Sequence, residues 1–158
     1  MSDTLHIRGL EVERGNKLRT CLPVLDTTIE IPITIINGRN DGPTLLITAG
    51  IHGGEYPGIA AAMELGRDIT PEDMHPVNIQ GFWARRAFVV PEDGKNLNRE
   101  FPGDVNGTLS QKTAWLLSQH FFPLADFYVD MHSGDIHEEL HPYVYYPGLP
   151  NNEISEKS

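Results

Sequence analysis

The segment TLLITAGI, residues 44–51, constrains the fold more than any other part of the sequence. Its residues are almost all apolar, which is typical of a strand covered on both faces. After the turn sequence HGGEYPG, apolar residues recur at every third or fourth position between residues 57 and 69, namely Ile59, Ala62, Met63, Gly66 and Ile69. This spacing predicts a helix with one buried face, and Pro57 suits its first turn. A buried strand that leads into such a helix predicts the β-α unit of an α/β protein.

The rest of the sequence extends this pattern. Alternating apolar and polar residues predict two half-exposed strands at 5–15 and 27–38, which we expect to pair antiparallel, with Pro32 favouring an edge position. The remaining predicted elements are one or two strands within 77–90, a long irregular loop at 91–107, a helix at 109–122 opened by a Thr108–Gln111 capping box, a buried strand at 125–131 and a last strand at 143–147. This order predicts a mixed, largely parallel sheet with flanking helices, in a single domain of residues 1–158.

Charge and composition limit the classes of partner. The net charge is −10 and the pI is about 5.0, which argues against a nucleic acid or an anionic membrane surface as partner. Arg85 and Arg86 form the only adjacent basic pair, which fits either a local pocket for an anionic group or a solvated loop. The single cysteine, Cys21, and the lack of a leader-like or membrane-spanning apolar run predict a cytoplasmic protein.

His52, Glu55 and His132 each lie just past the last apolar residues of a predicted buried strand. The carboxyl ends of parallel strands are where ligands gather in such sheets. Two imidazoles and a carboxylate are a ligand set that zinc accepts at a catalytic site, where a further position is left for water. The alternative is that His52 and Glu55 are a pair at the start of the following helix, where Glu55 compensates the helix dipole, and that His132 is a hydrogen-bonded strand-end histidine. The residues taken one by one leave this choice open.

Three motifs in order, AGIHGGEYPG, DGKNLNREFPG and YVDMHSGD, resemble the succinylglutamate desuccinylase and aspartoacylase family, which has a zinc carboxypeptidase-like fold of the phosphorylase/hydrolase type. The resemblance covers the chain from about residue 30 onward. It implies one zinc ion per chain, held by His52, Glu55 and His132. It also implies that water activated at this zinc hydrolyses an amide bond in an N-acyl amino acid or a similar small carboxylate.

The same resemblance implies roles for residues around the metal. Asn98 and Arg99 match the family's pair that binds the substrate carboxylate, a task that suits the planar guanidinium group. Arg86, or its neighbour Arg85, matches the arginine that binds substrate near the metal and stabilises the oxyanion.

Two further residues are expected to lie beside the metal ligands without binding the metal themselves. Asn96 would lie outside the ligands, and Asp130 would orient His132 or point away from it.

The sequence departs from the family pattern after His132. None of the later glutamates matches the family's water-activating glutamate, and the family's C-terminal part is not found in residues 1–158. The enzyme hypothesis therefore stands beside two others, a non-catalytic zinc- or carboxylate-binding module and a zinc carboxypeptidase acting on peptides. Apolar surface or a sheet edge left uncovered predicts a homo-oligomer or a complementing chain.

Overall fold

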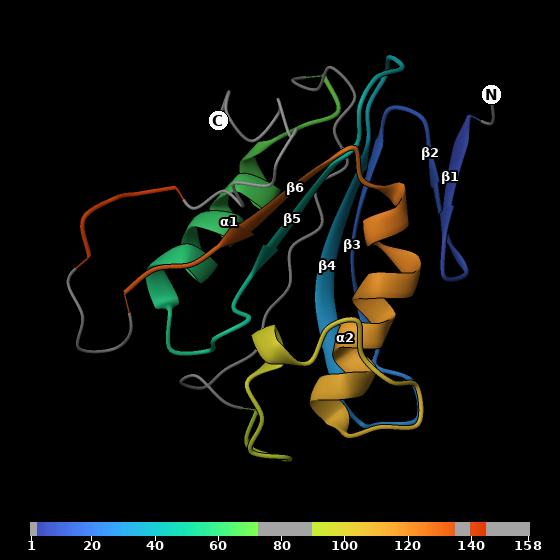
Figure 1. The fold of residues 1–158 in the computed structure, drawn as a ribbon. Coiled ribbons are helices and arrows are strands. Elements are labelled where there is room, and N and C mark those ends of the chain that lie inside the picture. Colours follow the sequence, from blue (N-terminus) through green and yellow to red (C-terminus); the bar gives the residue numbers. More distant parts are fainter. Residues whose placement is uncertain (1–2, 73–89, 135–139, 145–158) are drawn as a thin grey trace, which may run out of the picture.

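The computed structural model describes residues 3–72, 90–134 and 140–144 (Figure 1). In chain order, the elements are β1 (Thr4–Ile7), β2 (Leu10–Glu13), β3 (Asn16–Pro23), β4 (Glu30–Asn37), β5 (Leu45–Ala49), α1 (Tyr56–Asp68), a 3-10 helix (Leu97–Arg99), α2 (Leu109–His120), a second 3-10 helix (Phe122–Leu124) and β6 (Phe127–Met131). Strands and helices mix along the chain, which confirms the α/β prediction.

The N-terminal strands pair differently from the prediction. β1 and β2 form an antiparallel hairpin within the segment expected to be one strand. Its turn places Arg8 and Gly9 at φ angles of 48° and 79°, a region that glycine enters without steric cost. β4 pairs with β3 instead, a strand that the alternation of apolar residues did not reveal. The predicted pairing of 5–15 with 27–38 is therefore wrong, because Gly9 folds the first strand back on itself.

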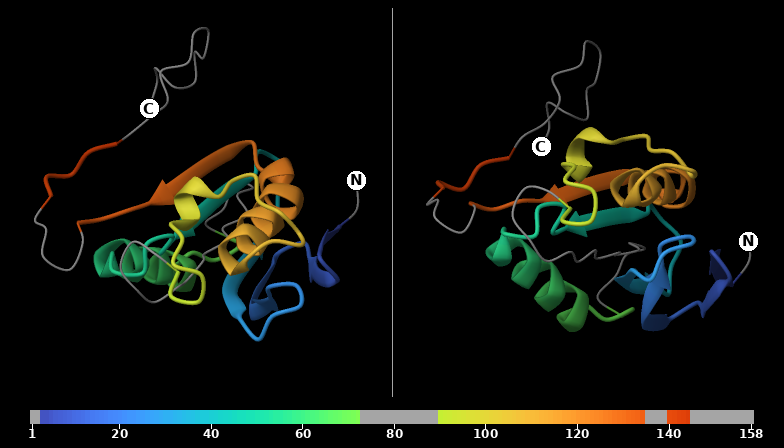
Figure 2. Two further views of the ribbon diagram at one scale, coloured as in Figure 1. Left: turned by 60° about the horizontal axis from the view of Figure 1, so that its bottom comes forward. Right: turned by 90° about the horizontal axis from the view of Figure 1, so that it is seen from below.

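β5 and β6 pair in parallel, with Leu45 opposite Phe127 and Ala49 opposite Met131. This register brings the carboxyl ends of the two strands side by side, although they are far apart in the sequence. After β5 the chain turns and enters α1, which starts at Tyr56 as the sequence indicated. Figures 1 and 2 show α1 and α2 on different sides of the β5–β6 pair.

The side chains of β5 alternate between two apolar clusters. Leu46 is buried in the larger cluster, which includes β1 to β4, Leu97 and the inner face of α2. Ile47 is buried in the smaller cluster, beside residues of α1 such as Leu65. β5 is thus covered on both faces, as its continuous apolar sequence predicted.

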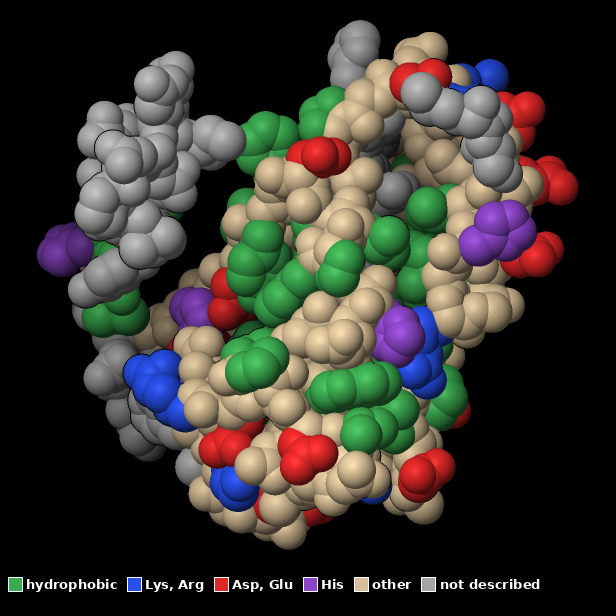
Figure 3. Space-filling model, turned by 45° about the vertical axis from the view of Figure 1, so that its right-hand side comes forward, with side chains coloured by type: hydrophobic (Ala, Val, Ile, Leu, Met, Phe, Trp, Pro, Cys, Tyr) green, Lys and Arg blue, Asp and Glu red, His purple; other side chains and the backbone are tan. Residues whose placement is uncertain are grey.

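Two predictions of burial are wrong. Phe127, Tyr128 and Val129 of β6 are 46%, 45% and 45% exposed, although the strand was expected to be buried. Met63, expected on the inner face of α1, is 52% exposed, since the helix turns Ile59 and Ala62 inward instead. Within the described ranges β6 has a strand neighbour on one side only. Figure 3 shows hydrophobic side chains gathered on one face of the molecule.

Some predicted elements cannot be compared in full. The segment 77–89 lies outside the described residues, and Val90 forms an isolated bridge with Lys95. Of the predicted last strand, residues 143 and 144 are described and are not part of a strand. In the ranges that are described, no helix has both the length and the apolar character needed to cross a membrane.

Candidate metal centre

The three predicted metal ligands come together at the carboxyl ends of β5 and β6. Gly50, at a φ of 77°, begins the turn after β5 that carries His52 and Glu55. His132 follows the last residue of β6 directly. The parallel register of the two strands is what joins the two ends, so the separation of these residues in the sequence is bridged by the sheet.

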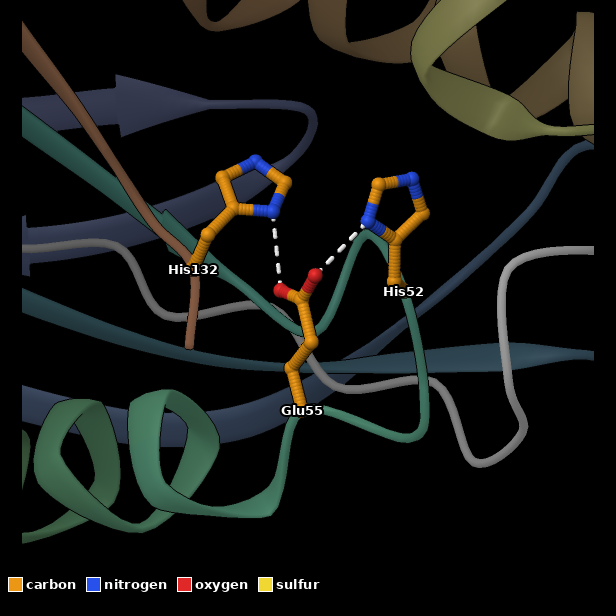
Figure 4. Close-up of side chains that lie close together, drawn as sticks. All are labelled: His52, Glu55 and His132. Atoms are coloured by element: carbon orange, nitrogen blue, oxygen red, sulfur yellow. Dashed lines mark hydrogen bonds and ion pairs between the residues drawn. The ribbon is translucent and has the colours of Figure 1, made fainter. Parts of the chain in front are cut away.

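The buried carboxylate of Glu55 lies between the two imidazole rings (Figure 4). His52 Nδ1 is 2.9 Å from Oε1 of Glu55, and His132 Nδ1 is 2.8 Å from Oε2. The rings lie with their centroids 5.0 Å apart. One ligand atom from each of the three residues falls within 4.8 Å of the other two.

The outward nitrogen of each ring has its own acceptor. Asn96 Oδ1 lies 3.2 Å from His52 Nε2 and also accepts the backbone N–H of Asn98, which identifies it as the amide oxygen. Asp130 Oδ2 lies 2.7 Å from His132 Nε2. Each acceptor holds a proton on Nε2, which leaves Nδ1 as the nitrogen that can bind a metal. Of the two orientations expected for Asp130, the structure shows the one toward His132, and the supporting roles of Asn96 and Asp130 stay predictions.

The electrostatics of His132 follow from these contacts. The hydrogen bond to Asp130 raises the pKa of His132 to about 9, an effect that burial opposes and that the charges of Asp130 and Glu55 reinforce. In the absence of a metal ion, the positive charge of this ring balances the paired carboxylates. A metal cation at Nδ1 would supply positive charge at the same place.

The backbone packs tightly behind His132. A Cβ atom on Gly58, in the first turn of α1, would lie 3.2 Å from the carbonyl oxygen of Met131 and 3.3 Å from the carbonyl carbon of His132. The backbone N–H of Ser133 lies 3.4 Å from Glu55 Oε2. These supporting positions were not predicted, because neither a glycine inside a helix nor a serine in the turn after a strand indicates a metal site by itself.

The alternative, in which the charge of Glu55 compensates the dipole of α1, is not tested by the contacts of Glu55. Glu55 is the N-cap residue of α1, but its side chain makes no capping hydrogen bond. Its two oxygens point to the histidines instead. His132 is hydrogen-bonded at the end of β6, as this alternative also expects, and it belongs to the same cluster.

The segment expected to bind the substrate carboxylate lies next to this cluster. Asn96 caps the 3-10 helix Leu97–Arg99, and Leu97 is buried in the larger apolar cluster. Arg99 is exposed, and its guanidinium group donates to the carbonyl oxygen of Asn98, 3.3 Å away. The substrate-binding roles of Asn98 and Arg99 stay predictions.

Asp93 anchors this segment in a way that the sequence did not reveal. Its carboxylate accepts the backbone N–H of Ser110 at 2.7 Å and the Ser110 hydroxyl at 2.9 Å, so it caps the N-terminus of α2. It also accepts the backbone N–H of Lys95 at 3.1 Å. The sequence predicts only an irregular loop at 91–107, in which Asp93 would form a turn. Arg85 and Arg86 lie outside the described residues, so their predicted roles cannot be compared with the structure.

The donor set fits zinc. Two imidazole nitrogens and one carboxylate are the protein ligands of a common type of catalytic zinc site. The convergence of these atoms, and the acceptor on each outward nitrogen, are the features that such a site requires.

Comparison with known proteins relates the sequence of this chain to one family. Residues 41–156 match the succinylglutamate desuccinylase/aspartoacylase catalytic domain. The N-alpha-acetyl-L-2,4-diaminobutyric acid deacetylase of Halomonas elongata is 36% identical over 123 residues, which are 73% of this chain and 35% of that protein.

Solved structures agree with this assignment. The succinylglutamate desuccinylase/aspartoacylase from Rhodobacter sphaeroides aligns with a TM-score of 0.69 at 33% identity, over 77% of this chain and 41% of the other. The product-bound ectoine utilization protein EutE (DoeB) from Ruegeria pomeroyi aligns with a TM-score of 0.65 at 30% identity, over 85% of this chain and 44% of the other. The chain thus spans less than half the length of these relatives, and it belongs to the succinylglutamate desuccinylase/aspartoacylase family.

Proposed function

We propose that this chain carries the zinc-binding part of a deacylase that hydrolyses the amide bond of an N-acyl amino acid or a similar small carboxylate. The observation that carries the proposal is the convergence of His52 Nδ1, His132 Nδ1 and the Glu55 carboxylate at the ends of β5 and β6. These three residues would hold one zinc ion. When bound, zinc polarises a carbonyl group and lowers the pKa of water toward about 7.

The residues of this chain would divide the remaining work. Asn96 and Asp130 hold the outward nitrogens of the two histidines, so that both rings stay turned toward the metal position. Asn98 and Arg99 would bind the substrate carboxylate, and Arg86 or Arg85 would stabilise the negative charge that develops on the amide oxygen. These assignments rest on the family motifs, which the chain contains in order.

The relatives indicate which acyl groups to test. One is named for removing an acetyl group from N-alpha-acetyl-L-2,4-diaminobutyric acid, and the family name refers to removing succinyl from succinylglutamate and an acyl group from aspartate. An acetylated diamino acid, N-succinylglutamate and N-acetylaspartate therefore form the first panel. A C-terminal dipeptide in the same panel tests the carboxypeptidase hypothesis.

A non-catalytic zinc-binding module is the second candidate. The two carboxylates described at the cluster, those of Glu55 and Asp130, are both hydrogen-bonded to the histidines. Neither is therefore free to act as the general base, whose absence typically costs about 10²- to 10⁴-fold in rate. Binding of zinc without turnover would favour this candidate over the enzyme.

The test is metal analysis of the purified chain beside a His132→Ala variant, with hydrolysis of the panel measured on the same samples. We expect about one zinc ion per chain in the wild type, since the site offers three ligands, and almost none in the variant. Equal metal content in the two proteins would overturn the proposal. With zinc bound, turnover of one acyl amino acid distinguishes the deacylase from the non-catalytic module.

A further inference from the structure

Thr48 is a buried polar residue in an otherwise apolar strand. It lies on β5 between Ile47 and Ala49, and 1% of its surface is exposed. Valine has nearly the same shape and would pack at this position without the cost of burying a hydroxyl group. The hydroxyl of Thr48 therefore needs partners inside the protein.

The partners are two residues of β6. Thr48 Oγ1 is 2.6 Å from Asp130 Oδ1 and 2.8 Å from the hydroxyl oxygen of Tyr128. Thr48 and Asp130 are direct neighbours across the parallel strand pair, so these contacts are built into the register of the sheet. The other carboxylate oxygen of Asp130 holds His132 Nε2 at 2.7 Å.

The direction of these hydrogen bonds follows from the number of protons. The Asp130 carboxylate can only accept, so the single hydroxyl proton of Thr48 is donated to it. Thr48 must then accept from Tyr128, whose hydroxyl is the donor. The phenol of Tyr128 is partly buried, although the residue as a whole is 45% exposed, and this desolvation and the nearby charge of Asp130 raise its pKa, which keeps it protonated. The chain of donors runs from Tyr128 through Thr48 to Asp130.

The hydrogen bonds from Tyr128 to Thr48 and from Thr48 to Asp130 fix the orientation of the Asp130 carboxylate. The last torsion of an aspartate side chain has a broad energy minimum, so one hydrogen bond to His132 does not define the carboxylate plane. A second hydrogen bond, from Thr48 to the opposite oxygen, does. The plane of Asp130 in turn defines the position of His132 Nε2–H, and so the direction of Nδ1 toward Glu55.

We propose that Thr48 is a positioning residue of the metal centre, which links Tyr128 to Asp130 and thereby orients His132 for zinc. The proposal rests on the proposed metal-binding function. Thr48 does not touch the metal position itself, and it acts through Asp130 and His132.

The main test measures zinc affinity by competition with a chromophoric chelator. We expect Thr48→Val to weaken binding about tenfold, the lower end of what loss of an outer hydrogen-bond partner costs. Thr48→Ser keeps the hydroxyl and should stay close to wild type. The matched control is Thr113→Val, the same change at a buried threonine of α2, which should leave the affinity unchanged. Equal affinity of Thr48→Val and wild type would overturn the proposal.

A double-mutant cycle tests whether Tyr128 acts on Asp130 through Thr48. Tyr128→Phe alone should weaken zinc binding by a smaller factor than Thr48→Val, because Asp130 keeps its donor. In the Thr48→Val background, Tyr128→Phe should have no further effect on zinc affinity. The valine already lacks the hydroxyl group that connects Tyr128 to Asp130. Full additivity of the two changes would contradict the proposed link. Tyr128→Phe also provides the test if Thr48→Val fails to fold.

A measurement without metal separates this proposal from the proposed function. In the metal-free protein, the Nε2 proton of His132 should give a downfield proton NMR signal, because Asp130 shields it from exchange with water. We expect the signal in wild type and in Thr48→Ser, and its loss by exchange in Thr48→Val. If wild type takes up no zinc, the proposed function fails, and this signal alone decides the role of Thr48. An unchanged signal in Thr48→Val would overturn that role.

Discussion

The strand-end cluster (His52, Glu55 and His132) and the loop of residues 90–100 both carry predicted site residues, but they are held in different ways. In the cluster, Glu55 is buried and the two histidines are hydrogen-bonded on both sides. In the loop, the buried Leu97 and the capping residue Asp93 fix the backbone, while the side chain of Arg99 is exposed.

This difference indicates a division of tasks. A metal site binds more tightly when its ligands are already oriented, because the ligand side chains then lose little conformational entropy on binding. An arginine that binds a substrate has to admit and release it, so only its backbone needs to be fixed. The comparison predicts that substitutions in the cluster change metal binding, and that substitutions in the loop change substrate binding or stability.

The largest expected effect is that of Glu55→Gln. The substitution keeps the size of the side chain but removes the charge that both histidines share. Zinc affinity should fall by more than about 100-fold, the upper end of the loss caused by removing an outer hydrogen-bond partner. Metal analysis after dialysis checks this. Glu64→Gln, at an exposed position of α1, is the control and should retain zinc. Retention of zinc by Glu55→Gln would place the metal elsewhere.

The second prediction concerns Arg99→Ala. Loss of a charge-assisted hydrogen bond to a carboxylate should weaken binding of an N-acyl amino acid by about 10- to 100-fold, seen as a rise in KM or in the dissociation constant. The zinc content should not change, because within the described residues the Arg99 side chain is hydrogen-bonded to Asn98 and not to the three candidate ligands. Arg67→Ala, on the exposed side of α1, is the matched control. Loss of zinc together with substrate binding would remove the distinction between the two regions.

The third prediction concerns stability. Asp93→Ala removes one capping group of α2, which keeps Thr108 and Gln111, together with the anchor of the 90–100 loop, and this should lower the free energy of unfolding by about 1–2 kcal/mol. Urea denaturation of the metal-free protein measures the change. Glu92→Ala, at the exposed neighbouring position, should have little effect. A loss of stability equal to that of Glu92→Ala would show that the cap contributes nothing.

The same residue gives a pH dependence. Burial raises the pKa of Asp93, but hydrogen bonds from the Ser110 and Lys95 backbone outweigh it, so the pKa lies below its ordinary value of 3.8. A depressed pKa in the folded state means that the carboxylate stabilises the fold above the unfolded-state pKa. This contribution is lost as the pH falls below about 4. The stability difference between wild type and Asp93→Ala should therefore narrow in that range.

The smallest expected effect is that of Gly58→Ala. The added Cβ would press on the backbone of Met131 and His132 and displace them by a few tenths of an ångström. Zinc affinity should fall a few-fold, while the stability of the metal-free protein stays within about 1 kcal/mol because alanine favours the helix. Ala60→Ser, at an exposed position of the same helix, is the control. An unchanged zinc affinity in Gly58→Ala would show that this close packing does not position His132.

Elements that depend on residues close together in the sequence were predicted better than strand pairing and strand exposure. α1 and α2 were predicted to within a few residues, because helical spacing, Pro57 and the Gln111 half of the capping box are local features. The antiparallel pairing was wrong, since one glycine turned an alternating segment into a hairpin. The exposure of β6 could not be predicted, because an apolar strand sequence does not say what covers it.

The sequence by itself selected the candidate residues of the metal centre. Residue types, their positions after apolar strands and three motifs were enough to select His52, Glu55 and His132, and to expect support from Asn96 and Asp130. The tertiary structure alone decided how these side chains are held. The register of β5 against β6 places Thr48 opposite Asp130, and Asp93 reaches α2 across a loop. Such contacts join residues distant in the chain, and they form only when buried polar groups find partners as the sheet and helices pack.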